Sequence, residues 1–375
     1  MSKDIGYNSD IKVAKRKLHV QTSYLKEEKR ASVEIFEGGA LVSQRYYNIE
    51  RIKPDKNVSQ EVDTIHELVK SDIELLFKVA PKVRTRKHLP AVIHLGKLFL
   101  QRGFYDQAIE FFKLAKKLDE TAKVDSYLGQ ALYYYGQYEE AARSLENAVE
   151  TANEYPDIHL WLGKTYWKMG RYTKAIEKMR QAIELNPNYF EAEYCLGLLL
   201  VDSCVYAPSI SALSPPIERI KEAESHFQKA VDLPELDAEL LNKGLEKLRE
   251  NGGAEKAYSY LEQAVGTESL NRNYIFDSEF YIKFMFGDLH KDDENLEFYI
   301  QRLQKLLNLN PDYADLRHSL GIAYLIKGWQ FFGKATDEFN RAVEINPEYH
   351  KACKKLRLMQ NDGKGLLILL RAILN

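Results

Sequence analysis

The stretch Pro156–Tyr189, PDIHLWLGKTYWKMGRYTKAIEKMRQAIELNPNY, decides the fold of this chain. It predicts two short helices joined by a turn at 168–171. Gly163 is expected where the helices cross, because a residue without Cβ lets two backbones approach closely. Pro187 ends the second helix, since proline lacks the backbone N–H and disfavours helical angles in the residue before it. One such hairpin cannot bury both its apolar faces, so we expect it to recur.

The hairpin does recur, at a spacing that points to a known repeat. Glycines at the crossing position are separated by 33, 34 and 34 residues: Gly96, Gly129, Gly163 and Gly197. The first three are followed by a turn glycine and then a tyrosine, in the pairs Gly103/Tyr105, Gly136/Tyr138 and Gly170/Tyr172. This pattern resembles the tetratricopeptide repeat, a helix–turn–helix unit of about 34 residues. The resemblance implies a mainly α fold, an α-solenoid of stacked hairpins.

The domain organisation follows from where the period starts and stops. We expect a flexible leader at 1–15, a small antiparallel β meander with its linker at 16–56, a capping helix and basic joint at 57–88, a solenoid of about seven repeats at 89–359, and an apolar C-terminal helix at 360–375.

The meander is predicted from a change to period two. Its three strands are expected at 19–25, 32–36 and 40–47, with Gly38-Gly39 supplying the positive φ of a hairpin turn. Three strands are near the minimum for stability, so a helix should cover them. The helix expected from Val58 to Ala80, ended by Pro81, could cover the meander, the first repeat, or both.

The second half of the array is irregular. The fourth copy is interrupted by an uncharged insert at 203–216, which could be a binding loop or a passive one. The fifth copy is degenerate, the sixth is centred on Gly287, and the seventh is a hairpin centred on Gly321, with two residues inserted around 329–333. The helix expected at 349–359 would cover the last repeat. The apolar helix after it could tuck into the solenoid, form a dimer contact, enter a partner's groove, or lie on a membrane surface.

Composition narrows the classes of function. The formal net charge of -2 gives no global attraction to nucleic acid or anionic lipid. Three cysteines (Cys195, Cys204 and Cys353) lack metal-ligand spacing and fit a reducing compartment. No signal peptide and no apolar run of about 20 residues is present in the sequence, so we expect no transmembrane segment and a cytoplasmic location. No phosphate-binding loop, histidine pair or nucleophile elbow occurs, so we predict no enzyme, no metal and no cofactor.

Binding is the positive prediction. The family resemblance implies that the first helix of each repeat lines a concave groove, with residues just after the crossing glycine pointing into it. Carried over, this gives Lys97, Leu100, Gln101, Gln130, Tyr133, Tyr134, Lys164, Trp167, Lys168, Leu198 and Val201. Aromatic rings with lysines suit an extended or helical peptide. The alternative is that Tyr133 or Trp167 only packs between neighbouring helices.

One narrower role is disfavoured. Chaperone adaptors of this family hold a C-terminal carboxylate with a clamp of lysine, asparagine and arginine. The matching positions here are Ser126, Gln130, Trp161 and Cys195. Such a clamp is therefore not expected in this chain.

Three hypotheses of function remain. The first is a non-enzymatic cytoplasmic adaptor or scaffold that binds partner proteins or peptides in the groove. The second is a self-assembling structural subunit of a larger, membrane-associated or free complex, with a homo-oligomer formed through the C-terminal helix. The third is a nucleic-acid binder using the basic joint, against which the near-zero net charge argues.

Overall fold

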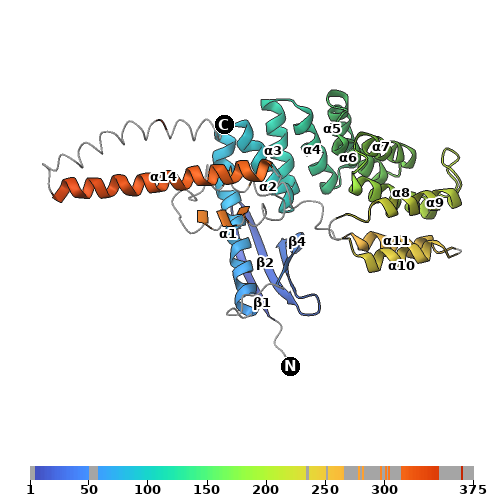
Figure 1. Cartoon of the computed structure of the whole chain (residues 1–375), viewed down its shortest axis with the longest axis horizontal. Coiled ribbons are helices and arrows are strands. Elements are labelled where there is room, and N and C mark those ends of the chain that lie inside the picture. The colour runs from blue at the N-terminus through green and yellow to red at the C-terminus, as the bar shows by residue number, and fades with distance from the viewer. Residues whose placement is uncertain are drawn as a thin grey trace. The chain divides into compact units, whose positions relative to one another are not determined.

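The computed structural model of the chain describes residues 5–49, 58–233, 236–250, 252–265 and 314–345, with isolated positions between 278 and 304 and at 365. The chain divides into two compact units, Met1–Ile275 and Phe276–Asn375. The first unit contains an N-terminal antiparallel sheet followed by helical hairpins (Figure 1). The predicted mainly α repeat fold with a small N-terminal sheet is confirmed.

The sheet has four strands instead of the predicted three. They are β1 (Gly6–Val13), β2 (Arg16–Leu25), β3 (Arg30–Glu37) and β4 (Ala40–Asn48), antiparallel in the order β1-β2-β3-β4. The prediction of a flexible leader at 1–15 is therefore wrong for residues 6–13. Only Ile11 and Val13 of β1 are buried apolar residues, so the strand lacks the apolar alternation that reveals a strand in sequence.

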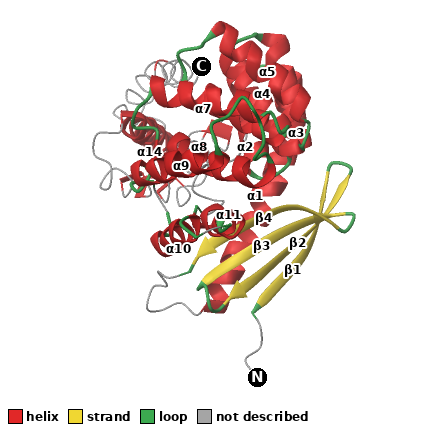
Figure 2. Cartoon of the chain, turned by 90° about the vertical axis from the view of Figure 1, so that its right-hand side faces the viewer, coloured by secondary structure: helices red, strands yellow, loops and turns green. Residues whose placement is uncertain are grey.

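Helix α1 (Val58–Arg86) covers one face of this sheet (Figure 2). Its His66 ring bonds the Ser9 hydroxyl at 2.8 Å and the Thr22 hydroxyl at 2.9 Å, which ties the helix to β1 and β2. Pro81 does not end the helix, contrary to the prediction. Proline removes only one hydrogen bond here, and the last turn continues past it, with Lys87 N–H donating to the Val83 carbonyl at 3.0 Å.

Five hairpins follow α1. Their helices are α2 (Leu89–Gln101) with α3 (Tyr105–Leu118), α4 (Ala122–Tyr135) with α5 (Tyr138–Thr151), α6 (Pro156–Lys168) with α7 (Tyr172–Leu185), α8 (Phe190–Tyr206) with α9 (Pro216–Lys229), and α10 (Ala238–Leu248) with α11 (Ala254–Ala264). The crossing glycines lie where predicted. A Cβ on Gly129 would come within 2.5 Å of Leu145, so only glycine lets α4 and α5 approach this closely.

The first three hairpins stack regularly onto the fourth. The second helix of each packs against the first helix of the next, as α3 on α4, α5 on α6 and α7 on α8 (Figure 1). The first helices α2, α4, α6 and α8 also contact one another in series. We call the surface formed by these four helices the first-helix face.

The fifth hairpin stacks differently. Its second helix, α11, packs against α8. The Tyr194 hydroxyl of α8 donates to the Leu261 carbonyl of α11 at 2.6 Å, a buried contact. Ala257 and Ala264 are fully buried on α11, and their small side chains allow a close helix–helix approach.

The insert predicted at 203–216 in the fourth copy forms a shorter loop than expected, because α8 continues to Tyr206. The loop at 207–215 is held by Arg219, whose side chain is only 1% exposed. Its guanidinium donates to the Ser203 hydroxyl at 2.7 Å and to the Pro208 carbonyl at 2.9 Å.

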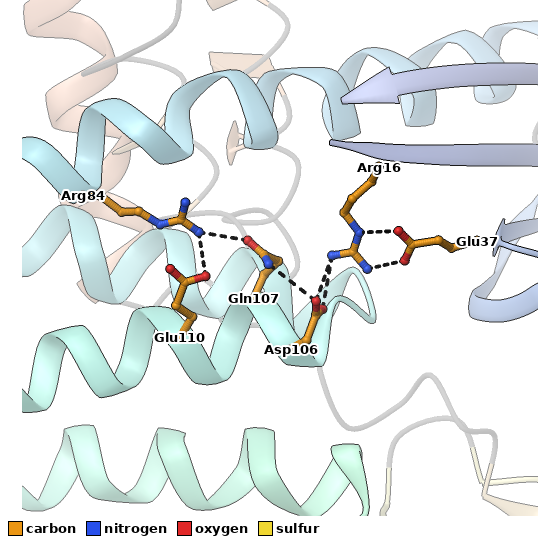
Figure 3. Close-up of polar contacts among 6 residues, drawn as sticks. All are labelled: Arg16, Glu37, Arg84, Asp106, Gln107 and Glu110. Carbon is orange, nitrogen blue, oxygen red and sulfur yellow. Dashed lines mark hydrogen bonds and ion pairs between the residues drawn. The ribbon is translucent and has the colours of Figure 1, made fainter. Parts of the chain in front are cut away.

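The sheet and the first hairpin are joined by a polar network (Figure 3). Arg16 of β2 donates to Glu37 at 2.8 and 2.5 Å and to Asp106 of α3 at 3.0 Å. Its guanidinium also lies 5.6 Å from the Phe77 ring centroid and 5.5 Å from that of Phe104. The hydrogen bond to Glu37 raises the pKa of Arg16, against the opposing effect of burial. The Arg16 guanidinium therefore joins the sheet to the first hairpin.

A second arginine strengthens the same joint from α1. Arg84 donates to Gln107 at 3.1 Å and to Glu110 at 2.7 Å, both on α3 (Figure 3). Part of the predicted basic joint is thus helical and bonded to the first repeat, and α1 contacts both the sheet and α2.

The second unit contains α14 (Ala314–Ile345), one continuous helix. The predicted hairpin of the seventh copy is wrong there, because the helix runs through the residues expected to turn. Gly328 and Gly333 are helical, since a glycine costs only about 1 kcal/mol inside a helix and does not by itself end it. The sixth copy is described only at isolated positions. The helix predicted at 349–359 lies outside the described residues, as does the C-terminal helix at 360–375 apart from Gly365, so both stay predictions.

Candidate protein-binding face

The eleven predicted contact residues all lie on the four helices of the first-helix face. They differ sharply in exposure. Val201 is completely buried, and Leu100 and Leu198 are each 9% exposed. Val201 is therefore a core residue that fills the space between repeats, and its assignment as a partner contact is wrong. Leu100 and Leu198 also contribute mainly to packing.

An aromatic cluster is centred on α4 and α6 of this face, and the first residues of the second helices α3 and α5 add one ring each. Tyr133 and Tyr134 of α4 lie edge to face with each other and with Trp161 of α6, at centroid distances of 5.4 and 5.6 Å. Tyr105 stacks on Tyr134 at 5.4 Å, and Tyr138 meets Tyr133 at 5.7 Å. We call these five residues the aromatic cluster. It joins the first three repeats, and all its rings remain partly exposed.

Burial acts on three tyrosines of this cluster. It raises the pKa of Tyr133 and Tyr134, with smaller effects from nearby charges, and also raises that of Tyr105. The hydroxyls of Tyr105, Tyr133 and Tyr134 are protonated at neutral pH, as an ordinary tyrosine also is, and can donate hydrogen bonds. The cluster offers a partner apolar ring surface and neutral donors.

Lys164 has partners within the protein. Its side chain is 9% exposed, and its ammonium donates to Glu191 of α8 at 2.6 Å and lies 4.8 Å from the Trp161 ring centroid. Desolvation opposes its charge, but the Glu191 carboxylate stabilises it, so its pKa is raised. Burial raises the pKa of the Cys195 thiol to about 11. Lys164 thus links the third and fourth repeats.

Trp167 is likewise bonded to the next repeat. Its indole N–H donates to the Asp202 carboxylate of α8 at 2.7 Å. Burial, followed by the effect of Asp202, raises the pKa of the neighbouring Tyr172 to about 12. This geometry agrees with the alternative prediction for Trp167, which is packing between neighbouring helices.

The other predicted polar residues of the face are more accessible than Lys164. Lys97 of α2 is half-buried, with its ammonium 4.5 Å from the Tyr127 ring centroid. Gln130 is half-buried and donates to the Ser126 hydroxyl at 3.3 Å, and Gln101 is half-buried as well. Lys168 at the end of α6 is exposed. A partner can reach Lys97, Gln101, Gln130, Lys168 and the aromatic cluster.

Three residues of this face were missed or undervalued in sequence. Trp161 entered only through the clamp comparison, and neither Glu191 nor Asp202 was selected. The two carboxylates have a register signal: Glu191 lies 34 residues after Asp157, and Asp202 follows Gly197 by the same five residues that separate Tyr134 from Gly129.

The comparisons with known proteins identify the repeat. Residues 129–170 match the sequence model described as TPR repeat, and residues 156–189 match the one described as Tetratricopeptide repeat. The chain is a tetratricopeptide repeat protein. No curated protein matches this tetratricopeptide repeat chain.

Similar solved structures include two described as tetratricopeptide repeat proteins. A tetratricopeptide repeat protein from Parabacteroides merdae ATCC 43184 is 21% identical, over 72% of this chain and 98% of that chain, with a TM-score of 0.35. MamA is 22% identical, over 47% and 94%, with a TM-score of 0.34. A thermophilic TPR protein of Thermus thermophilus is 15% identical, over 64% and 100%, with a TM-score of 0.35. At these TM-scores the neighbours carry no argument about function.

Two kinds of site do not occur in the described residues. No group of three or more histidine, cysteine, aspartate or glutamate side chains in the described part of the chain could hold a metal ion. No helix among the described residues is long and apolar enough to cross a membrane.

Proposed function

We propose that this tetratricopeptide repeat protein is a non-enzymatic adaptor that works in the cytoplasm and binds partner proteins on its first-helix face. The observation that carries the proposal is the aromatic cluster, which presents partly exposed rings from three consecutive repeats on one surface. Tyrosine and tryptophan supply large contact area at low entropic cost and are enriched at interface hot spots.

The contact set that supports this proposal is smaller than the sequence suggested. Lys164 and Trp167 each bond a carboxylate of the next helix, at 2.6 and 2.7 Å. Changing either would break the stacking of repeats and so confuse a binding experiment with a folding defect. The contacts we propose are Lys97, Gln101, Gln130, Tyr133, Tyr134 and Lys168.

Charge refines the kind of partner. The central Lys164 is neutralised by Glu191, so the middle of the face favours uncharged side chains. Lys168 is exposed and forms no ion pair with another described residue. We therefore expect a segment with apolar or aromatic residues over the cluster and an acidic residue toward Lys168.

The test compares two variants with the same change of charge. Lys168→Glu changes the first-helix face, whereas Lys117→Glu changes an exposed position on α3. Tagged full-length proteins are used for affinity purification, and co-purifying proteins are quantified by mass spectrometry. We expect Lys168→Glu, alone or with Tyr134→Ala, to deplete a specific set of partners that Lys117→Glu retains.

Thermal unfolding followed by circular dichroism shows whether each variant is folded. Folded variants that retain every partner of the original protein would overturn the assignment of this face. Equal depletion by Lys117→Glu would show a general charge effect and would also contradict it.

A further inference from the structure

The face of the sheet that α1 does not cover has a hollow of its own. It measures about 550 Å³ and lies over β1, β2 and β3. Its side chains include Asp10, Lys12, Lys17, His19, Gln21 and Phe36, and Gly38-Gly39 of the β3–β4 turn also lines it. Its volume is within the range of sites that bind small ligands or short segments, about 300–1,000 Å³.

Two lysines of this hollow lie directly opposite each other on neighbouring strands. Lys12 of β1 is paired directly opposite Lys17 of β2, so the two side chains leave the same face of the sheet. Both are exposed, and neither forms an ion pair with another described residue. Like charges at directly opposed positions destabilise a sheet. A bound anionic group would relieve this repulsion.

The next row of the sheet adds an acceptor and an aromatic ring. Asp10 is paired opposite His19, and its carboxylate bonds the His19 Nδ1 at 2.8 Å while its side chain remains 85% exposed. The Phe36 ring lies 6.4 Å from the His19 ring, and Leu41, its partner on β4, is 54% exposed. Two cations, one anionic acceptor and the apolar surface of Phe36 and Leu41 thus lie at adjacent positions of the sheet.

We propose that this face of the sheet is a second binding site, for an acidic peptide segment of a partner protein. Carboxylates of the segment bind Lys12 and Lys17, an apolar side chain lies on Phe36 and Leu41, and a backbone N–H donates to Asp10. A phosphate-rich polyanion fits less well than a segment with one or two carboxylates, because its many closely spaced charges would be repelled more strongly by the Asp10 carboxylate. The site does not depend on the first-helix face.

The experiment is a titration of the full-length protein by fluorescence anisotropy. The probe is a short labelled peptide that alternates glutamate with leucine, and its control is the same peptide with glutamine in place of glutamate. The test variant is Lys12→Gln with Lys17→Gln. The matched control is Lys26→Gln with Lys29→Gln, which removes two exposed lysines from the β2–β3 turn at the other end of the sheet.

We expect the test variant to weaken binding of the glutamate peptide about tenfold and the matched control to stay within about twofold. Binding should weaken as salt rises, and the glutamine peptide should bind poorly. Leu41→Ser should weaken binding a few-fold through loss of apolar contact. The test variant should unfold at the same temperature as the original protein or higher, because it loses only exposed like charges.

Three results would overturn the proposal: equal affinity of the test variant and the original protein, equal binding of the two peptides, or tighter binding of a short single-stranded oligonucleotide through the same lysines. The Lys168→Glu variant should bind the peptide as the original protein does. Failure of the first-helix face and failure of this site are therefore distinguishable.

Discussion

The three hairpins before α8 and the hairpin α10–α11 after it are built in the same way but stack differently. Within each hairpin a glycine faces a large side chain, as Gly163 faces Met179 and Gly244 faces Leu261, with the added Cβ at 2.8 and 2.6 Å. The packing between hairpins differs. In the regular part the second helix of one hairpin packs on the first helix of the next, as α7 packs on α8. In the irregular part α11, the second helix of the later hairpin, packs back on α8, the first helix of the hairpin before it.

This difference separates two levels of information in the sequence. The glycine and its partner specify the hairpin, and they persist where the period of the array is broken. The stacking of one hairpin on the next depends on individual contacts, such as Lys164 with Glu191 in the regular part and Tyr194 with Leu261 in the irregular part. Changes at the two levels should therefore have different consequences.

The largest effect is expected from Gly129→Val. Its side chain would overlap Leu145, since even a Cβ lies 2.5 Å from the Leu145 Cγ, and α4 would be forced from α5. We expect a loss of about 3 kcal/mol in the free energy of unfolding, measured by urea denaturation. The control is Gly136→Ala, at a turn with φ 86° and open space, which should lose about 1 kcal/mol from the backbone alone. Equal losses would contradict the crossing as the source.

The next effect depends on pH and belongs to the regular half. Burial, with smaller effects from Lys97 and Lys123, lowers the pKa of His94 to about 4. The folded protein thus favours the neutral ring, and stability from this group is complete above the unfolded pKa of about 6.5 and falls as pH drops toward 4. The loss at pH 4 is about 3 kcal/mol.

The measurement is the free energy of unfolding at pH 7 and at pH 4.5 for the original protein and for His94→Gln. Carboxylates and other histidines also titrate, so only the difference between the two proteins reports His94. We expect the variant to lose less stability on acidification. Parallel pH profiles would contradict the lowered pKa of His94.

The sequence predicts the regular hairpins well because their signal is local and repeated. Gly96, Gly129 and Gly163 lie at the crossings as expected, and Gly136 and Gly170 take the positive φ of the turns. The strand at 6–13 was missed because its buried side of Tyr7, Ser9, Ile11 and Val13 is half polar. Hydrogen bonds from Tyr7 to Ser59 and from Ser9 to His66 make these positions favourable, and they depend on a helix more than 50 residues away.

The candidate site was predicted in position but not in role. Family register places all eleven residues on the first helices, yet register does not say which are covered by the next repeat. Lys164 and Trp167 are bonded because the fourth repeat has carboxylates at Glu191 and Asp202. Pairing across repeats depends on two positions at once, and the reading of single positions missed it.

A smaller effect is expected at the insert of the irregular half. Arg219→Met keeps the volume of the side chain but removes its hydrogen bonds to Ser203 and Pro208, so we expect a loss of about 2 kcal/mol. Amide hydrogen exchange at 203–216 should rise, while exchange in α4 and α6 stays unchanged. The control is Arg180→Met, whose exposed pair with Glu222 should contribute less than about 0.5 kcal/mol. Unchanged exchange in the loop would show that Arg219 does not hold it.

The smallest effect tests the stacking of α11 on α8. Tyr194→Phe removes the hydroxyl that donates to the Leu261 carbonyl and leaves that buried oxygen without this donor, which should cost about 1 kcal/mol. Because the hairpin α10–α11 packs on α8 through this region, limited proteolysis should release it faster than in the original protein. Tyr155→Phe, at an exposed tyrosine, should change neither stability nor cleavage. If Tyr194→Phe behaves in the same way, apolar packing of Ala257 and Ala264 alone holds α11 in place, and the stacking in the irregular half depends on shape, with no contribution from the hydrogen bond.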